Sequence, residues 1–154
     1  MGLNDEMSSE TIWTNEGERS FAYIRSISYN ESVSNILRDV NKEFKSLKMQ
    51  DHWYCGYLVI SEHDWDLIKG DLGEEASNLE VHGGMTFFEG RYHDSAGKCS
   101  FVWRGAPCIC IGWDYNHSGD GDQTLEDVIK DVRAVQQKLE DMITKGGPEY
   151  KIVT

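Results

Sequence analysis

The sequence predicts an α+β fold: a mainly antiparallel sheet of about five or six strands with two principal helices packed on one face. Short segments rich in β-branched and aromatic residues recur between glycine-bearing turns, which is typical of strands. Two longer segments carry apolar residues at helical spacing. At 154 residues the chain suits one domain, which we predict over residues 20–154, after a mobile acidic N-terminal tail over residues 1–19.

Each element of the first half follows from its own pattern. Alternating aromatic and polar residues predict a strand at 21–29, and an apolar stripe predicts the first helix at 32–48. Residues 53–60 (WYCGYLVI) are aromatic and β-branched, so they predict a central strand. Gly56 inside this strand marks a bulge or a close approach of another part of the chain.

The second half predicts a loop with one short helix at residues 61–78, and then a series of short strands. These strands are predicted at residues 79–82, 85–88, 100–103 and 109–114. The second helix is predicted at 125–144, because Thr124 and Asp127 resemble a capping box and Gly146 followed by Pro148 ends a helix. Residues 150–153 predict an edge strand.

Charge and composition exclude several classes of protein. The 15 basic and 27 acidic residues give a net charge of −12, so the basic surface that nucleic-acid binding uses is missing and no direct nucleic-acid binding is expected. No apolar run approaches the ~18 residues of a membrane span, and no signal peptide is evident. We therefore expect a cytoplasmic protein with no membrane contact. The five tryptophans and seven tyrosines exceed what a core needs, which is compatible with a homo-oligomer.

The cysteines predict packing rather than chemistry. Cys108 and Cys110 alternate within one apolar run, so they lie on the same face of a strand and are too close in sequence for an easy disulfide. In a cytosol we expect these two residues, together with Cys55 and Cys99, to be reduced small hydrophobic side chains.

The first unusual polar segment is Val-His-Gly-Gly-Met-Thr-Phe at residues 81–87. Two glycines inside a β-forming run cost conformational entropy, and they provide a positive φ or a close backbone approach. His82 just before Gly83 and Gly84 can direct its ring at a ligand. The structural alternative is a turn beside a histidine whose hydrogen bonds are already satisfied.

The second unusual segment, residues 112–122, has three interpretations. As a structural loop, its Asp, Asn and Gly residues form turns, which leaves His117 unexplained. As an EF-hand calcium loop it has suitable residues at several positions, namely Asp114, Asn116, Ser118, Gly119, Asp120 and Asp122. However, Leu125 stands at position twelve, where the bidentate Glu is required. As a ligand or catalytic site, it would place His117 and His82 around one pocket, with Asp114 or Asp120 orienting an imidazole.

Together the two segments resemble a widespread family of small bacteriophage and prophage proteins. The shared features are a Trp/Tyr-Cys-Gly-Tyr strand (here WYCGY), the Val-His-Gly-Gly-hydrophobic-Thr segment and a Gly-aromatic-Asp-x-x-His-x-Gly-Asp segment before a final helix. The resemblance covers about residues 53–142. It implies a phage origin, and its shared polar positions are His82, Gly83, Gly84, Thr86, Asp114, His117, Gly119 and Asp120. Small accessory phage proteins often counter host defence, by capturing or destroying nucleotide second messengers or by binding a defence protein.

The first functional hypothesis is therefore a counter-defence protein that binds, or in addition hydrolyses, a small polar nucleotide-like signalling ligand. His82, His117, Asp114 and Asp120 would be the acid–base groups, and Gly83, Gly84, Thr86 and Asn116 would contact the ligand. Aromatic side chains would stack on a base, namely Trp53, Tyr54, Trp103 and Trp113. Arg91, Lys98 and Arg104 would lie near phosphate. Two histidines and a carboxylate would also make a ligand set for a metal ion, but their spacing matches no helical zinc motif, and the sequence leaves the cofactor open.

The second hypothesis is an acidic inhibitor, or nucleic-acid mimic, that binds a host defence protein directly. The net charge of −12 favours it. The acidic face would combine residues of the last helix, Glu126, Asp127, Asp131, Glu140 and Asp141, with tail residues Asp5, Glu6, Glu10, Glu16 and Glu18. An ordinary solvated helix surface has the same pattern.

Overall fold

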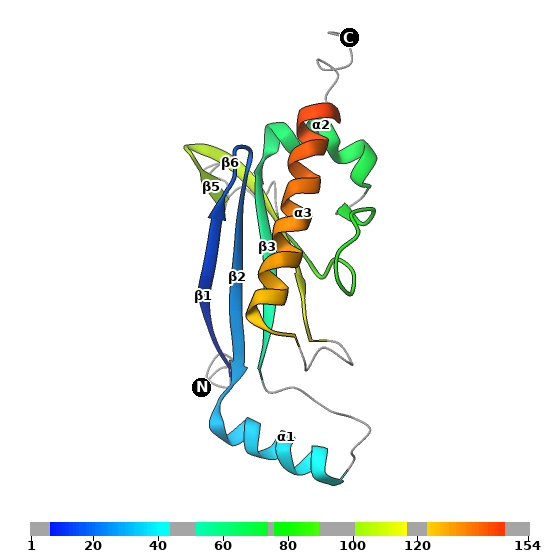
Figure 1. Ribbon diagram of the computed structural model, residues 1–154. Coiled ribbons are helices and arrows are strands. Elements are labelled where there is room, and N and C mark those ends of the chain that lie inside the picture. Colours follow the sequence, from blue (N-terminus) through cyan, green and yellow to red (C-terminus); the bar gives the residue numbers. More distant parts are fainter. Residues whose placement is uncertain (1–6, 44–51, 74–75, 90–100, 117–122, 147–154) are drawn as a thin grey trace.

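The computed structural model of the chain describes residues 7–43, 52–73, 76–89, 101–116 and 123–146 (Figure 1). Within these residues, six strands form one antiparallel sheet accompanied by three helices. In chain order the elements are β1 (Met7–Glu16), β2 (Ser20–Tyr29), α1 (Glu31–Glu43), β3 (His52–Ser61), α2 (Glu62–Leu72), β4 (Phe87–Glu89), β5 (Phe101–Trp103), β6 (Ala106–Asp114) and α3 (Leu125–Gly146).

The predicted fold class is confirmed. The strand order is β1-β2-β3-β6-β4, with β5 also pairing with β6, and every pair is antiparallel. The helices on the sheet face are α2 and α3, whereas α1 lies beyond the lower end of the sheet (Figure 1). Of the apolar stripe predicted for the first helix, Leu37 is buried but Ile36 is exposed.

The predicted mobile tail over residues 1–19 is wrong for its larger part, because Met7–Glu16 form β1. This strand pairs with β2 along its whole length and is an edge of the sheet. The register shifts between Thr11 and Trp13, which marks a β-bulge. The bulge allows two consecutive side chains, Ile12 and Trp13, to pack against the main core.

The predicted short strands are confirmed in part. Residues 87–89 and 101–103 form β4 and β5, and β6 extends over Ala106–Asp114. Residues 79–82 do not form the predicted strand, and they lead into a turn in which the Gly84 amide donates to the Val81 carbonyl at 3.0 Å. The edge strand predicted at 150–153 lies outside the described residues.

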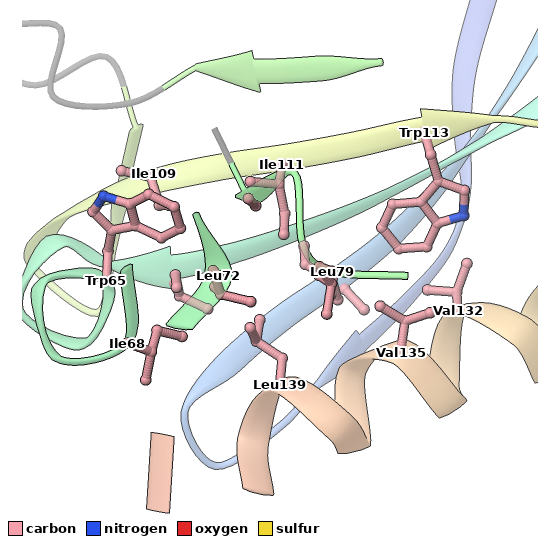
Figure 2. Packing of buried hydrophobic residues seen from close by; sticks show 14 of the residues in the cluster. Trp65, Ile68, Leu72, Leu79, Ile109, Ile111, Trp113, Val132, Val135 and Leu139 are labelled. Carbon is pink, nitrogen blue, oxygen red and sulfur yellow. The ribbon is translucent and has the colours of Figure 1, made fainter. Parts of the chain in front are cut away.

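The sheet has one face covered by helices and one face that the described helices leave open. The main core lies between the sheet and α2 and α3, where Trp65 lies beside Ile109 and Trp113 lies over Val132 and Val135 of α3 (Figure 2). A smaller cluster on the open face contains Val59, Cys108 and Cys110, and no helical residue belongs to it. Because strand side chains alternate between faces, residue parity decides which core each one joins.

Gly56 and the capping box of the last helix behave as predicted. A Cβ atom on Gly56 would lie 2.8 Å from Val132 Cγ2 of α3, so the glycine permits a close approach of helix and sheet. The Asp127 amide donates to Thr124 Oγ1 at 3.1 Å, and the Thr124 amide donates to Asp127 Oδ2 at 3.2 Å. These reciprocal bonds fix where α3 begins.

The cysteines within the described residues are reduced and buried, as predicted, namely Cys55, Cys108 and Cys110. Cys99 lies outside those residues. No helix in the described part of the chain has both the length and the apolar character needed to cross a membrane.

Candidate functional site

The His82 segment forms a tight turn that is fixed on both sides. Gly83 and Gly84 have φ values of 70° and 88°, in the left-handed region that glycine tolerates best. Before the turn, Leu79 is buried in the main core, and after it the Thr86 amide donates to the Gly112 carbonyl at 3.0 Å. The side chain of Thr86 and both glycines are exposed. The turn therefore presents backbone and a hydroxyl group from a rigid base.

The imidazole of His82 stacks on the ring of Tyr115. The ring centroids are 4.7 Å apart and the planes differ by 18°. Tyr115 is only 2% exposed, and its amide donates to the Tyr54 carbonyl at 2.9 Å, which extends the pairing of β3 and β6. His82 is half-buried, so one part of its ring packs on Tyr115 while another part reaches the surface.

Two polar partners hold Tyr115 in place. Its hydroxyl group donates a short hydrogen bond to Asp131 Oδ2 on α3 and accepts one from Trp113 Nε1 at 2.9 Å. The Asp131 carboxylate therefore stabilises the tyrosine that supports His82. Sequence reasoning missed both residues. Tyr115 stood inside the recognised motif, but Asp131 was assigned to the acidic face of the last helix.

The structure does not bring His82 and Asp114 together. Asp114 pairs with Cys55 in the register of β3 and β6, and by alternation it lies on the open face, opposite to Tyr115. One of its oxygens, Oδ1, accepts from the Asn116 amide at 3.1 Å and shapes the chain as it leaves β6. Burial, together with the nearby Asp114 charge, raises the pKa of Cys55 to about 11. Asp114 therefore does not orient the His82 imidazole, and the predicted roles of His117 and Asp120 lie outside the described residues.

The predicted base-stacking residues are dispersed. Trp113 is 1% exposed and belongs to the core, and Trp53 is buried on the open face in an edge contact with Tyr29. Tyr54 is half-buried next to the Tyr115 backbone, with the His52 ring edge-on at 4.9 Å. The His52 Nε2 atom shares a 2.6 Å hydrogen bond with Ser26 Oγ, a pairing that no sequence motif indicated.

Arg104, predicted to contact phosphate, lies at the opposite end of β6, about 25 Å along the strand from Asp114. Its guanidinium group donates to Glu16 and to the carbonyls of Gly17 and Glu18, and it stacks on Trp103 at 4.1 Å. Arg104 therefore stabilises the turn between β1 and β2 rather than the candidate site. The remaining predicted residues, His117, Asp120, Arg91 and Lys98, lie outside the described residues.

The surface of the last helix, predicted to be acidic, carries both acidic and basic side chains in the structure. Glu126, Asp127 and Asp141 are exposed, but Asp131 binds Tyr115. Glu140 accepts hydrogen bonds from the Arg19 amide and the Ser20 hydroxyl group, so it too turns toward the sheet. Four basic side chains of α3 are also exposed, namely Lys130, Arg133, Lys138 and Lys145.

Two hollows lie away from His82. One, of about 740 Å³, lies between the ends of α2 and α3 and is lined by residues such as Asp71, Lys138 and Met142. The other, of about 330 Å³, lies beside the β1–β2 turn, next to Gln136 and Glu140. Residues 117–122, which carry most of the ligands of the calcium interpretation, lie outside the described residues, so that interpretation stays untested. Within the described residues there is no group of three His, Cys, Asp or Glu side chains placed to hold a metal ion.

Comparison of the chain with protein-family models, with curated proteins and with solved structures found no match.

Proposed function

We propose that the protein captures a small, planar, polar ligand of the nucleotide-like class at the His82–Gly84 turn. The observation that carries the proposal is the stacking of His82 on the buried Tyr115, which Asp131 and Trp113 hold from behind. An imidazole fixed in this way loses little conformational entropy when a ligand binds, so more of the contact energy is available as affinity.

The turn offers the groups that a nucleobase uses. Gly83, Gly84 and Thr86 are exposed beside His82, so backbone carbonyls of the turn and the Thr86 hydroxyl group can meet the edge of a base, whereas the Gly84 and Thr86 amides already donate to Val81 and Gly112. The half-buried imidazole supplies a flat surface on which the base stacks. Since Arg104 is engaged at the other end of the sheet, we propose recognition of the base and its sugar rather than of phosphate.

Capture is favoured over hydrolysis by the position of the carboxylates. A general base needs a partner within hydrogen-bonding reach, and Asp114 is on the other face of the sheet from His82. Asp131, on the correct face, is bonded to Tyr115. In the phage setting that the sequence resemblance implies, such a protein would lower the free concentration of a defence signal by holding it.

Calorimetric titration tests this proposal. The panel contains the four ribonucleosides, their monophosphates and the cyclic dinucleotides of adenine and guanine. We expect His82→Ala to weaken binding about tenfold or more, because stacking on a base is worth about 1–3 kcal/mol. His63→Ala, which removes an exposed histidine on α2, should bind as the wild type does. Equal binding by His82→Ala and the wild type would contradict the proposal, as would a panel in which nothing binds.

Charge reversal on α3 distinguishes ligand capture from the hypothesis that the protein binds a defence protein directly. Glu126→Lys combined with Asp141→Lys changes two exposed acids of α3 that lie outside the Tyr115 contacts. Ligand capture predicts that this variant keeps its activity against host defence and that His82→Ala loses it. The opposite result would favour a protein that binds its target through the acidic helix.

A further inference from the structure

We propose that Ser26 and His52 form a nucleophile–base pair that accepts acyl groups from small activated esters, such as phenyl esters and thioesters. The inference does not rest on ligand capture at His82, because it concerns a different pair of side chains and a chemical reaction. It follows from the geometry of the pair, from the way in which the sheet holds it and from its accessibility.

The hydroxyl group of Ser26 lies within hydrogen-bonding reach of an imidazole nitrogen. Ser26 Oγ and His52 Nε2 are 2.6 Å apart, which is within the range found between a serine nucleophile and its base. When the ring proton is on Nδ1, Ser26 donates this hydrogen bond and Nε2 is free to take the serine proton. Among the described residues, neither side chain has another hydrogen bond, so neither is engaged elsewhere.

Two adjacent strands and one aromatic ring fix the pair. The register of β2 and β3 sets Ser26 opposite Tyr54 and Ser28 opposite His52, so these four side chains share one face of the sheet. The His52 ring lies edge-on to the Tyr54 ring, with the centroids 4.9 Å apart and the planes at 86°. A third group that orients the base is part of the usual arrangement for an activated serine. Here Tyr54 provides it by packing.

The pair is accessible to a small molecule. Ala22 and Ile24 have the same parity on β2 as Ser26, and both are fully buried beneath the helices. Toward the end of the strand this cover stops, because β2 and β3 extend below the first turn of α3 (Figure 1). Ser26 is half-buried there and His52 is exposed. A substrate can therefore reach the serine oxygen from the solvent side.

The surroundings of Ser26 restrict the substrates to activated acyl groups. Because β2 lies between β1 and β3, its backbone amides are engaged in the sheet and cannot stabilise the oxyanion of a tetrahedral intermediate. Glu10 is the register partner of Ser26 on β1, and its exposed carboxylate disfavours further negative charge nearby. Esters with a good leaving group need the least stabilisation of that charge.

The reaction has two balanced steps. Ser26 Oγ forms a bond to the acyl carbon while its proton passes to His52 Nε2, and the leaving group departs with that proton as its bond to the carbon breaks. A water molecule then attacks the acyl carbon, gives a proton to Nε2, and the bond to Ser26 Oγ breaks as this oxygen takes the proton back. The second step cleaves an ordinary alkyl ester, which is less reactive than the substrate. We therefore expect the acylated serine to accumulate.

Reaction with p-nitrophenyl acetate tests the proposal. We expect an initial burst of nitrophenol and an acetyl group on Ser26, which peptide mapping by mass spectrometry locates. His52→Gln should slow this acetylation about a hundredfold or more, because it removes the general base. Ser28→Ala is the matched control, since Ser28 is the register partner of His52 but shares its 3.0 Å hydrogen bond with Ser8. It should be acetylated on Ser26 at the wild-type rate.

His63→Ala removes another exposed histidine and should also react as the wild type does. Circular dichroism establishes that each variant is folded, and peptide mapping of the wild type needs no variant. A wild type without acetyl on Ser26 overturns the proposal. So does equal labelling of Ser26 and Ser28, because any exposed hydroxyl group would then suffice. Acetylation of Ser26 at an unchanged rate in His52→Gln would show that His52 is not the base.

Discussion

Gln136 shows how one buried polar side chain ties distant parts of the chain together. It lies on α3, is 4% exposed, and accepts from Asn15 Nδ2 at 2.8 Å. Its Nε2 atom donates to the Asn15 carbonyl at 3.2 Å and to Ser20 Oγ at 3.1 Å. The side chain therefore joins the helix to both strands of the β1–β2 hairpin, at the end that Arg104 and Glu140 also hold.

We predict that Gln136→Ala lowers the free energy of unfolding by about 1–3 kcal/mol, because it removes the partner of the part-buried Asn15 side chain and one of the two partners of the buried Ser20 hydroxyl group. The neighbouring Gln137 is exposed and bonds only along the helix to Asp141. Gln137→Ala should therefore stay within about 0.5 kcal/mol of the wild type. Urea unfolding followed by circular dichroism measures both. Equal effects of the two variants would show that Gln136 does not link the hairpin to the helix.

At the level of single residues, part of the candidate site could be predicted from the sequence. His82 and its glycines stood out because their residue types are costly in a strand. The face on which Asp114 lies could also be predicted from the sequence. Cys108, Cys110 and Asp114 are all at even positions of one strand, so they share a face, whereas Tyr115 is at an odd position and lies on the other face. The bond between Asp131 and Tyr115 could not be predicted from the sequence, because helical periodicity does not show which residue outside the helix a partly exposed carboxylate contacts.

Among the elements, α3 was predicted closely and β1 was missed, for opposite reasons. The capping box, the apolar stripe and the glycine at the end of α3 are local signals that agree with the final packing. The first half of β1 is exposed and polar, and the bulge places Ile12 and Trp13 side by side against the core. Strand recognition depends on alternation, which the bulge breaks.

The contact between β3 and α3 can be tested at one glycine. Gly56→Ala would place a Cβ atom 2.8 Å from Val132 Cγ2 and 3.2 Å from the Trp113 ring, so we predict a loss of about 1–3 kcal/mol of stability. Gly70→Ala, in the last turn of α2, meets nothing within 4 Å. That control should raise stability by about 0.5–1 kcal/mol, because alanine is the better helix former. Thermal unfolding of the two variants should move in opposite directions; a neutral Gly56→Ala would contradict the close approach.

For the whole molecule, the class of fold was predictable but its arrangement was not. Turns and short strands indicate an antiparallel sheet without indicating that β6 lies between β3 and β4, since pairing depends on contacts far apart in sequence. This order brings the end of β6 to Tyr54 and sets Tyr115 under His82. The proposed site therefore depends on the His82 segment, which can be recognised in the sequence, and on the strand order, which cannot.

The most direct test of ligand capture is native mass spectrometry of the protein purified from phage-infected bacterial cells. We predict that the wild type carries a small molecule with nucleobase absorbance, which is released unchanged on denaturation. His82→Ala should be purified without it, and His63→Ala should retain it. A wild type with only the mass of its own chain, under conditions where it still blocks host defence, would contradict capture and favour direct binding to a defence protein.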